Sequence, residues 1–433
     1  PKSDYLNVTD QSAQKLSNLI LGLPATNITG TTDRYIREIV YDSRKSGFGS
    51  LFVAVPGENW DGGAFIQDAL DKGASTFITE TSLDSLSGLG LGSRDVTALF
   101  VEDARKALST VSANFYRRPS ERLALTGITG TNGKTTTAYI LEALFEAQGA
   151  RTGVIGTINY HYGGKELSAP VTTPESLDLN RMLDEMIKDG IKNCFLEVSS
   201  HALHQSRVHD MRFKAGIFTN LSRDHLDFHG DIESYKNAKK KLFLDNYVQW
   251  KVFNIDDPVG KEFSGEFKTD SFTTGIDSNG DFKAEDIALT KAGCQFTLKT
   301  PFGTGEIHSN LLGRHNIHNL LSAAAGAMAQ GISLEKIQNV FLQIQPIPGR
   351  FESIDNDQGF SVLVDYAHTD DALSKAISAA KAFTKGRLIV VFGCGGDRDK
   401  GKRKAMGQAV ISEADFSIIT SDNPRTEDPE QII

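Results

Sequence analysis

The segment Gly130-Thr131-Asn132-Gly133-Lys134-Thr135-Thr136 restricts what this chain can fold into more than any other part of the sequence. It separates an apolar run at residues 122–128, which predicts a buried strand, from a helical pattern at residues 135–148. Glycines let backbone N–H groups approach phosphate oxygens, and the start of a helix adds positive potential. The lysine can reach the terminal phosphates, and the hydroxyl of the next residue can bind Mg²⁺. This arrangement predicts an α/β domain that binds a nucleotide.

The loop departs from the usual phosphate-loop spacing, GxxxxGK[ST], because the first glycine of that pattern would fall at Ile128. The second half of the pattern, Gly133-Lys134-Thr135, is intact. The alternative is a Gly-rich turn that arose by chance, and the strand–turn–helix context makes it the weaker interpretation. The loop by itself does not distinguish ATP from GTP.

Breaks in the pattern divide the chain into three blocks. Proline-containing stretches at residues 117–120 and 346–349 mark the boundaries, since proline disfavours helix in the residue before it. We therefore expect domains at residues 1–118, 119–349 and 350–433.

Strands and helices alternate through most of the chain, which is typical of a mostly parallel sheet covered by helices. The central block has strand-like runs at residues 153–158, 193–198, 215–220 and 251–255, followed by short antiparallel strands within residues 284–309. The third block has strand-like runs at residues 361–365, 387–392 and 416–420 and reads as a second α/β unit. Such sheets usually have more strands, so we expect this last domain to be incomplete at Ile433.

Composition excludes several classes of protein. A net charge of −9 argues against a protein that wraps nucleic acid or lies on an anionic membrane, and an acidic protein that binds anions must gather its cations locally. No apolar run reaches the ~18 residues of a membrane span. Cys194, Cys294 and Cys394 lie far apart and form no metal-binding spacing, which fits a reducing cytoplasm.

Two further strands of the central block end in residues that can bind a metal ion. Glu197 ends one strand and His225 follows the next, so both are expected at the carboxyl edge of the sheet, where ligands of parallel α/β proteins bind. A carboxylate there can hold Mg²⁺. The alternatives are a solvated strand end for the glutamate and a structural role for the histidine.

Lys239 lies on the apolar face of a helix expected at residues 232–243, together with Tyr235 and Leu242. A buried lysine tends to lose its proton, and a neutral amine can react with CO₂ to give a carbamate, an anion that can bind metal. The alternative is that the side chain extends to solvent, and from the spacing alone this alternative is favoured. Lys236 and Lys240 are expected to point elsewhere.

Taken together and in this order, the motifs resemble those of the Mur ligases. The resemblance runs from about Asp42 to the end of the chain. It rests on the phosphate loop and on Glu197-Val198-Ser199-Ser200-His201, Asp224-His225-Leu226-Asp227, Ala238-Lys239, His315-Asn316-Ile317-His318-Asn319, Gly349-Arg350-Phe351-Glu352 and Asp365-Tyr366-Ala367-His368. It implies an N-terminal α/β domain that binds a UDP precursor, a central phosphate-loop ATPase-like domain with a mostly parallel sheet, and a C-terminal Rossmann-like domain that binds an amino acid.

The resemblance also implies roles for single residues. ATP and Mg²⁺ are the implied cofactors, with Thr135, Glu197, His225 and a carbamylated Lys239 as metal ligands. Asn319, Arg350 and Asp365 are implied to contact adenine, phosphate and ribose. Ser43 is an implied UDP contact, and Glu58-Asn59-Trp60 occupies another position of that kind.

Within the family, the ligases that add the third residue of the peptide are the most similar. The implied substrate is UDP-N-acetylmuramoyl-L-alanyl-D-glutamate, held by Thr172, Thr173, Ser199, Gln205 and Arg207. The implied amino-acid pocket contains Arg398, Asp422, Asn423, Pro424 and Arg425. The family's remaining pocket residues, a Gly and a Glu, are expected beyond Ile433.

The two arginines of this pocket favour one amino acid over another. Meso-diaminopimelate has a second carboxylate, onto which Arg398 and Arg425 can form forked hydrogen bonds, whereas the side chain of L-lysine ends in an ammonium that arginine repels. We therefore expect meso-diaminopimelate as the amino acid. The alternative for Arg425 is that it only caps a surface loop.

The resemblance implies an ATP-dependent amide ligase of peptidoglycan synthesis, cytoplasmic and monomeric, with a part in cell-wall biogenesis, cell shape and cell division. Four alternatives remain at this point. The chain could be the L-lysine-adding ligase of the family or a ligase like folylpolyglutamate synthetase. It could be a phosphate-loop switch or motor that hydrolyses ATP without an amino acid. It could also bind the precursor and ATP without forming product.

Overall fold

The computed structural model describes residues 13–57, 60–91, 94–290, 292–354 and 356–433. The chain divides into two compact units. The first contains Pro1–Leu123, Pro174–Asp189 and Ala202–Met211, and the second contains Ala124–Thr173, Gly190–His201 and Arg212–Ile433. The expected boundaries at residues 118 and 349 stay a prediction. Among the described residues, none of the helices combines the length and the hydrophobicity that a membrane span requires.

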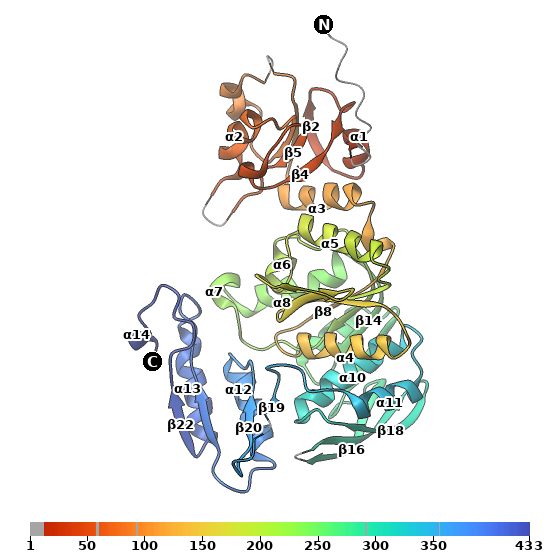
Figure 1. The fold of residues 1–433 in the computed structure, drawn as a ribbon, viewed down its shortest axis with the longest axis vertical. Coiled ribbons are helices and arrows are strands. Elements are labelled where there is room, and N and C mark those ends of the chain that lie inside the picture. Colours follow the sequence, from red (N-terminus) through yellow and green to blue (C-terminus); the bar gives the residue numbers. More distant parts are fainter. Residues whose placement is uncertain (1–12, 58–59, 92–93, 291, 355) are drawn as a thin grey trace. The chain divides into compact units, whose positions relative to one another are not determined.

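The first unit is built on a five-stranded sheet in the order β2-β7-β6-β5-β4 (Figure 1). The strands β4 to β7 are parallel and β2 is antiparallel to β7. Its regular elements are β1 (Gln14–Lys15), α1 (Leu16–Leu19), β2 (Ala25–Thr29), β3 (Tyr35–Ile36), β4 (Glu38–Val40), β5 (Ser50–Val53), α2 (Ile66–Asp71), β6 (Thr76–Thr79), β7 (Thr97–Val101), α3 (Ala104–Phe115) and α5 (Ser176–Lys188).

The second unit has an eleven-stranded sheet in the order β11-β10-β9-β12-β8-β13-β14-β15-β16-β17-β18. In this spatial order, the neighbouring strands β9, β12, β8, β13, β14, β15 and β16 run parallel. Antiparallel hairpins close both ends of the sheet, and the one within residues 284–309 was predicted. The strands are β8 (Ala124–Thr129), β9 (Thr152–Ile155), β10 (Asn159–Tyr162), β11 (Lys165–Ser168), β12 (Asn193–Glu197), β13 (Arg212–Phe218), β14 (Tyr247–Asn254), β15 (Ser271–Gly275), β16 (Phe282–Thr290), β17 (Gly293–Thr300) and β18 (Gly303–Ser309).

The strand order reverses at β8, and this position decides where the site lies. The chain continues from β8 to β9 on one side of the sheet, whereas β13 and β14 lie on the other side. Loops that leave neighbouring strands in opposite directions open a crevice at the carboxyl end of such a sheet. The phosphate loop leaves β8 at this crevice.

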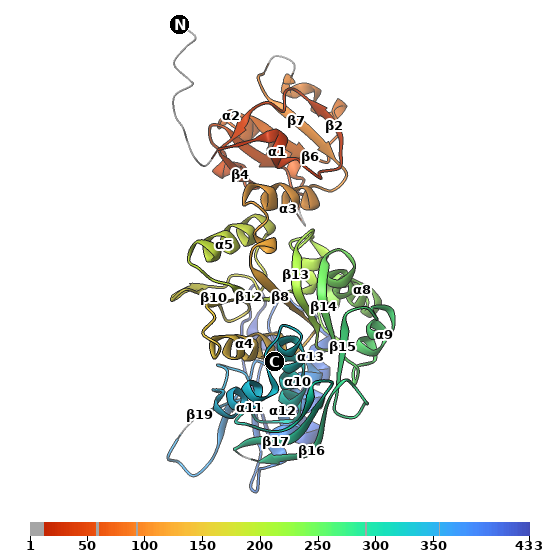
Figure 2. The same ribbon diagram turned by 90° about the vertical axis from the view of Figure 1, so that its right-hand side faces the viewer.

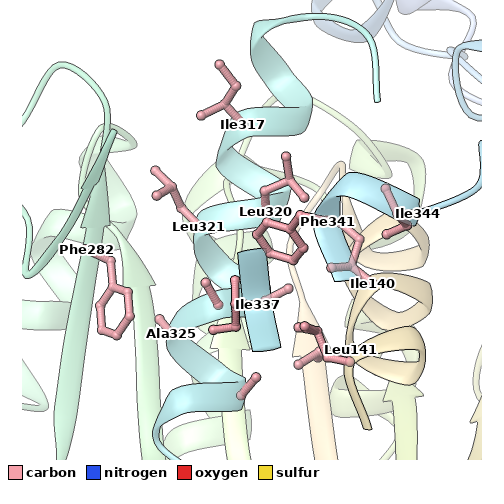
Figure 3. Packing of buried hydrophobic residues seen from close by; sticks show 14 of the residues in the cluster. Ile140, Leu141, Phe282, Ile317, Leu320, Leu321, Ala325, Ile337, Phe341 and Ile344 are labelled. Carbon is pink, nitrogen blue, oxygen red and sulfur yellow. The ribbon is translucent and has the colours of Figure 1, made fainter. Parts of the chain in front are cut away.

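Helices cover both faces of this sheet. Figure 2 shows α8 (Ile232–Leu244) and α9 (Pro258–Glu266) on the opposite side of β14 from α10 (Arg314–Met328). The helix α4 (Lys134–Glu146) packs on α10, and α11 (Leu334–Gln343) packs on β18. Fully buried side chains from α4, α10 and α11 interlock in one apolar cluster, shown in Figure 3. The short helices α6 (Ser200–His204) and α7 (Leu226–His229) follow the ends of β12 and β13.

The C-terminal part of the second unit carries the three predicted strands in two separate ladders. The strand β19 (Glu352–Ile354) pairs antiparallel with β20 (Val362–Val364), and β21 (Ile389–Phe392) pairs parallel with β22 (Phe416–Ile419). The helices α12 (Asp370–Lys381) and α13 (Gly401–Glu413) pack against each other, and α14 spans Pro429–Ile432.

The packing of α11 generates a test of the core. Phe341 is fully buried in the apolar cluster, whereas its neighbour Leu342 is 55% exposed. We expect Phe341→Ala to lower the free energy of unfolding by about 3–5 kcal/mol, because it removes buried apolar area and leaves a cavity. The control Leu342→Ala should change it by less than about 0.5 kcal/mol. Urea unfolding followed by circular dichroism measures both, and equal effects would contradict the packing shown in Figure 3.

Candidate active site

Residues from all seven predicted motifs line one cleft in the second unit. The cleft has a volume of about 840 Å³ and lies over the carboxyl ends of β8, β12 and β13. Its wall includes the phosphate loop from Thr131 to Thr136 and the predicted site residues Thr172, Glu197, Ser199, His225, Lys239, Asn319, Arg350, Asp365 and Arg398. The structure therefore brings together the predicted nucleotide and metal residues, which lie far apart in the sequence.

The phosphate loop is compact because two of its glycines approach other side chains closely. A Cβ atom at Gly130 would lie 1.9 Å from Thr219 Oγ1, and one at Gly133 would lie 2.3 Å from Asn319 Oδ1. Gly133 also has a φ of +86°, in the left-handed region that glycine adopts without cost. A larger residue at Gly130 would collide with the segment that follows β13, and one at Gly133 would collide with the Asn319 side chain of α10. The predicted strand–turn–helix arrangement is confirmed.

The side chain of Lys134 folds back onto its own loop. Its Nζ donates to the carbonyl oxygens of Gly130 and Thr131, each at 2.9 Å. Burial lowers the pKa of this lysine, and the carboxylate of Glu197 opposes the shift. The ammonium is thus held inside the loop that would surround a bound phosphate.

Glu197, at the end of β12, is fully buried, so the solvated strand end considered for it is wrong. Its Oε1 accepts a hydrogen bond from the backbone N–H of Thr157 at 2.8 Å, and its Oε2 accepts one from the Thr157 hydroxyl at 3.1 Å. A Cβ atom at Gly156 would lie 2.2 Å from Oε1. The turn at Gly156-Thr157 therefore fixes the direction of this carboxylate.

Lys239 is only 1% exposed, so the alternative in which it extends to solvent is wrong. Its Nζ donates to the Gly130 carbonyl at 2.8 Å and lies 4.4 Å from the centre of the Tyr235 ring. Burial, reinforced by the charge of Lys134, lowers its pKa well below the ordinary value. Lys236 and Lys240 point away, as predicted, and pair with Glu262 and Glu266.

His225 follows β13 and stands beside the buried Asp224, whose Oδ2 lies 3.3 Å from its Nε2. Loss of hydration lowers the pKa of His225 to about 3, against the opposing charge of Asp224. A neutral imidazole is the form that binds metal ions. Burial alone would raise the pKa of Asp224, but a hydrogen bond from His368 and nearby positive charges outweigh it and lower that pKa.

The three predicted nucleotide residues already bind protein groups. Asn319 donates to Asn316 Oδ1 at 2.8 Å, and Arg350 donates to the Thr135 hydroxyl at 2.9 Å. Asp365 accepts from the backbone N–H groups of Phe351 and Ala367. All three side chains line the cleft beside the phosphate loop.

The predicted muramoyl-peptide residues are divided between the two units. In the second unit, the Thr172 hydroxyl lies 3.2 Å from that of Thr157, and Thr173 donates to the Glu197 carbonyl at 2.8 Å. The backbone N–H of Ser199 donates to the Thr173 hydroxyl at 3.0 Å. Hydroxyl groups thus connect this segment to the buried glutamate.

The other predicted precursor residues belong to the first unit. Ser43 is buried at the start of a short 3₁₀ helix, and its carbonyl accepts from Lys72 at 3.3 Å. Arg207 donates to Gln205 at 2.7 Å. Glu58 and Asn59, at another predicted UDP position, lie outside the described residues.

The predicted amino-acid residues lie in the C-terminal part of the second unit. Arg398, Asp422 and Arg425 line a second cavity of about 1520 Å³, and Arg398 also lines the cleft with the phosphate loop. Arg425 donates to the Gly396 carbonyl at 2.6 Å, and the backbone N–H of Gly396 donates to the Asn423 carbonyl at 2.8 Å. These bonds join the two predicted pocket segments.

The donor groups of the cleft fit a magnesium ion that shares its coordination with a nucleotide. Among the described residues, no group of three His, Cys, Asp or Glu side chains forms a complete metal site. Mg²⁺ is usually bound through one or two carboxylates, with waters and substrate phosphates as further ligands. Glu197 supplies a buried carboxylate, Thr135 a hydroxyl and His225 an imidazole on the wall of one cleft.

Thr157 and Asp224 were not predicted as site residues. The strand pattern at residues 153–158 runs past the end of β9 at Ile155, so the turn that places Thr157 on Glu197 was read as part of a strand. Asp224 was noted only as part of a motif. Its contacts with His368 and Lys402 come from segments more than 140 residues away, and local spacing carries no signal for them.

Family profiles match three parts of the chain. They are described as the Mur ligase family catalytic domain at residues 35–116, the Mur ligase middle domain at residues 128–327, and the Mur ligase glutamate ligase domain at residues 349–433. Together these matches cover most of the described residues.

Several proteins that are similar in sequence share one name. The chain is 41% identical over 426 residues to a UDP-N-acetylmuramoyl-L-alanyl-D-glutamate–2,6-diaminopimelate ligase of Geobacillus kaustophilus, covering 97% of this chain and 85% of that protein. A solved structure of a ligase with this name has a TM-score of 0.74 and 32% identity, covering 97% of this chain and 85% of the other. A folylpolyglutamate synthase of Mycobacterium tuberculosis, with 18% identity and a TM-score of 0.57 over 76% of this chain and 81% of that one, shares the fold. This chain belongs to the Mur ligase family.

Proposed function

We propose that this chain is an ATP-dependent ligase that joins meso-diaminopimelate to the D-glutamyl carboxylate of UDP-N-acetylmuramoyl-L-alanyl-D-glutamate. One observation carries the proposal. A buried glutamate and a buried lysine share a cleft with a phosphate loop and with an arginine from the predicted amino-acid segment. A switch or motor that only hydrolyses nucleotide has no use for this set of residues. The names of the relatives support the same substrates.

The proposed reaction has two steps that balance. The γ-phosphoryl group of ATP moves to the D-glutamyl carboxylate, giving an acyl phosphate and ADP. The amine of the amino acid then attacks the acyl carbon, loses a proton and forms the amide, and phosphate leaves with the electrons of the C–O bond. The work of the protein is positioning and the stabilisation of charge.

The residues of the cleft have separate tasks in this proposal. Lys134 and the backbone N–H groups of the phosphate loop hold the phosphates, and Arg350 adds a second cation beside them. Asn319 and Asp365 hold the nucleoside. Thr135, Glu197 and His225 would hold Mg²⁺, which would supply positive charge to neutralise the transferring phosphoryl group. The hydroxyls of Thr172, Thr173 and Ser199 orient the carboxylate that receives the phosphoryl group.

Lys239 acts in this proposal as a carbamate. Its amine is buried and its pKa is lowered well below the ordinary value, so the neutral form that reacts with CO₂ is accessible. The reaction forms an N–C bond and releases one proton. The product is an anion that can bind metal and that offsets the nearby charge of Lys134.

The three free cysteines and the use of ATP fit a cytoplasmic enzyme.

The proposed substrates are tested by phosphate release from ATP in the presence of the muramoyl dipeptide precursor. We expect release with meso-diaminopimelate and little release with L-lysine, because arginine attracts the second carboxylate and repels an ammonium. Release with L-lysine but not with meso-diaminopimelate would support a ligase and refute the proposed choice of amino acid. Release that requires no amino acid would support a nucleotide hydrolase instead.

A second prediction concerns Lys239. We expect Lys239→Ala to lower kcat by about 100-fold or more, since residues that complete a metal site typically matter this much. The matched control is Lys240→Ala, because Lys240 lies on the same helix and pairs with Glu266. Carbon-13 NMR in ¹³CO₂ should show a carbamate signal in the wild type that disappears only in Lys239→Ala. Full activity of that variant would refute the proposed role.

A third prediction concerns Arg425. We expect Arg425→Met to raise the KM for meso-diaminopimelate about 100-fold, because a charge-assisted hydrogen bond to a carboxylate is lost, and to change the KM for ATP by less than about twofold. Lys404→Met, an exposed position on α13, serves as the control. An equal rise in both KM values would instead indicate that Arg425 only supports the loop through its bond to Gly396.

A further inference from the structure

Two loops of the second unit meet through charged side chains that the proposed chemistry does not use. The His225 loop comprises residues 222–227, which follow β13 and include the start of α7, and the Arg398 loop comprises residues 396–402, which include the first two residues of α13. One carries a predicted metal ligand and the other carries a predicted amino-acid ligand. The contacts between the loops are therefore contacts between the two halves of the site.

The charges on the two loops are complementary in a crossed pattern. Arg223 and Asp224 are adjacent and of opposite sign. Arg223 Nη2 lies 3.7 Å from Asp399 Oδ2, and Asp224 Oδ1 lies 3.6 Å from Lys402 Nζ. Each loop thus offers one cation and one anion to the other. This pattern favours a single register between the loops, because a shift would place like charges together.

The pair formed by Asp224 and Lys402 is buried. The side chain of Asp224 is 4% exposed and that of Lys402 is 11% exposed. Asp224 receives a second cation-forming group from the C-terminal segment, since His368 Nε2 lies 3.4 Å from its Oδ2. An exposed ion pair contributes little, but a buried acid that loses its partner is costly.

Each acid also binds the backbone of its own loop. Asp224 Oδ1 accepts from the His225 N–H at 2.9 Å, where the histidine has a φ of +52°. Asp399 Oδ1 accepts from the Gly401 N–H at 2.8 Å, and its Oδ2 is buried without a hydrogen bond among the described groups. Each carboxylate therefore joins the backbone of its own loop to a cation of the other.

We propose that Arg223, Asp224, Asp399 and Lys402 are positioning residues that hold the Arg398 loop against the His225 loop. Through the contacts of these four residues, the conformational order of the amino-acid segment and that of the metal segment depend on each other. None of the four needs to touch substrate. The assignment rests on the proposed function for the roles of the two loops and not for the contacts themselves.

The first experiment measures hydrogen–deuterium exchange of the full chain by mass spectrometry. Lys402→Met keeps the length of the side chain and removes its charge. The amides of Phe228, His229 and Gly230 are bonded within the turn that follows His225, so their exchange reports its order. We expect exchange across residues 221–230 to become about tenfold faster, although the substitution lies in another segment.

The matched control is Lys400→Met. Lys400 lies in the Arg398 loop but pairs with Glu427, on the same side of the interface. Its replacement should leave exchange at residues 221–230 unchanged. If Lys402→Met also leaves it unchanged, or if both variants accelerate it equally, the proposed coupling is wrong.

The second experiment exchanges the charges of the other pair. Arg223→Asp and Asp399→Arg should each lower kcat/KM for the amino acid about threefold, as expected for a partly exposed ion pair. The double variant should recover most of the loss. Because Asp399 also binds the Gly401 N–H, the decisive quantity is the interaction between the two substitutions rather than either single effect. Independent losses that multiply in the double variant would overturn the pairing.

The two proposals fail in different ways. If the wild type releases no phosphate with any amino acid, the proposed function is wrong, and the exchange experiment still decides whether the loops are coupled, because it needs no turnover. If the wild type is active and Lys402→Met leaves the exchange of residues 221–230 unchanged, the function stands and the coupling is refuted.

Discussion

The carbonyl oxygen of Gly130 accepts hydrogen bonds from two lysines, Lys134 and Lys239, and the rest of the site depends on this arrangement. It requires the phosphate loop to lie close to the end of β13, which a side chain at Gly130 would prevent. Two ammonium groups near one carbonyl repel each other. This repulsion decreases when one of the lysines loses a proton or when an anion binds beside them. A nucleotide and a carbamate are the two anions that the proposed reaction would supply there.

The two acids of the site, Glu197 and Asp224, are also held in place by other groups of the protein. Glu197 is fixed by the Gly156-Thr157 turn, and Asp224 is fixed by groups from two distant segments. Both carboxylates therefore point into the cleft without help from a ligand, and preorganised groups of this kind stabilise charge without reorganising during a reaction. The protein is acidic overall, with a net charge of −9, yet Lys134, Arg350 and Arg398 gather on the wall of this cleft. This is the local concentration of cations that an acidic anion-binding protein needs.

Much of the fold could be predicted, because it depends on local patterns. Alternating strands and helices predict a mostly parallel sheet, and β12, β13, α4 and α8 lie within a few residues of the predicted ranges. Other elements were missed for a physical reason. The strands β11 and β15 have no buried apolar side chain, so their sequences show little of the alternation that marks a strand. The order of the strands in the sheet could not be predicted either, because it depends on contacts between segments far apart in the sequence.

The sequence by itself determined the phosphate loop, the strand ends that carry Glu197 and His225, and the helix face of Lys239. These follow from spacing along a single element. Only the tertiary structure decided how deeply those groups are buried. Helical spacing favoured a Lys239 that extends to solvent, because periodicity gives the direction of a side chain and not the depth of the packing above it. The contacts of Glu197 with Thr157 and of Asp224 with Lys402 have the same origin, since the folded chain brings together groups that no local pattern connects.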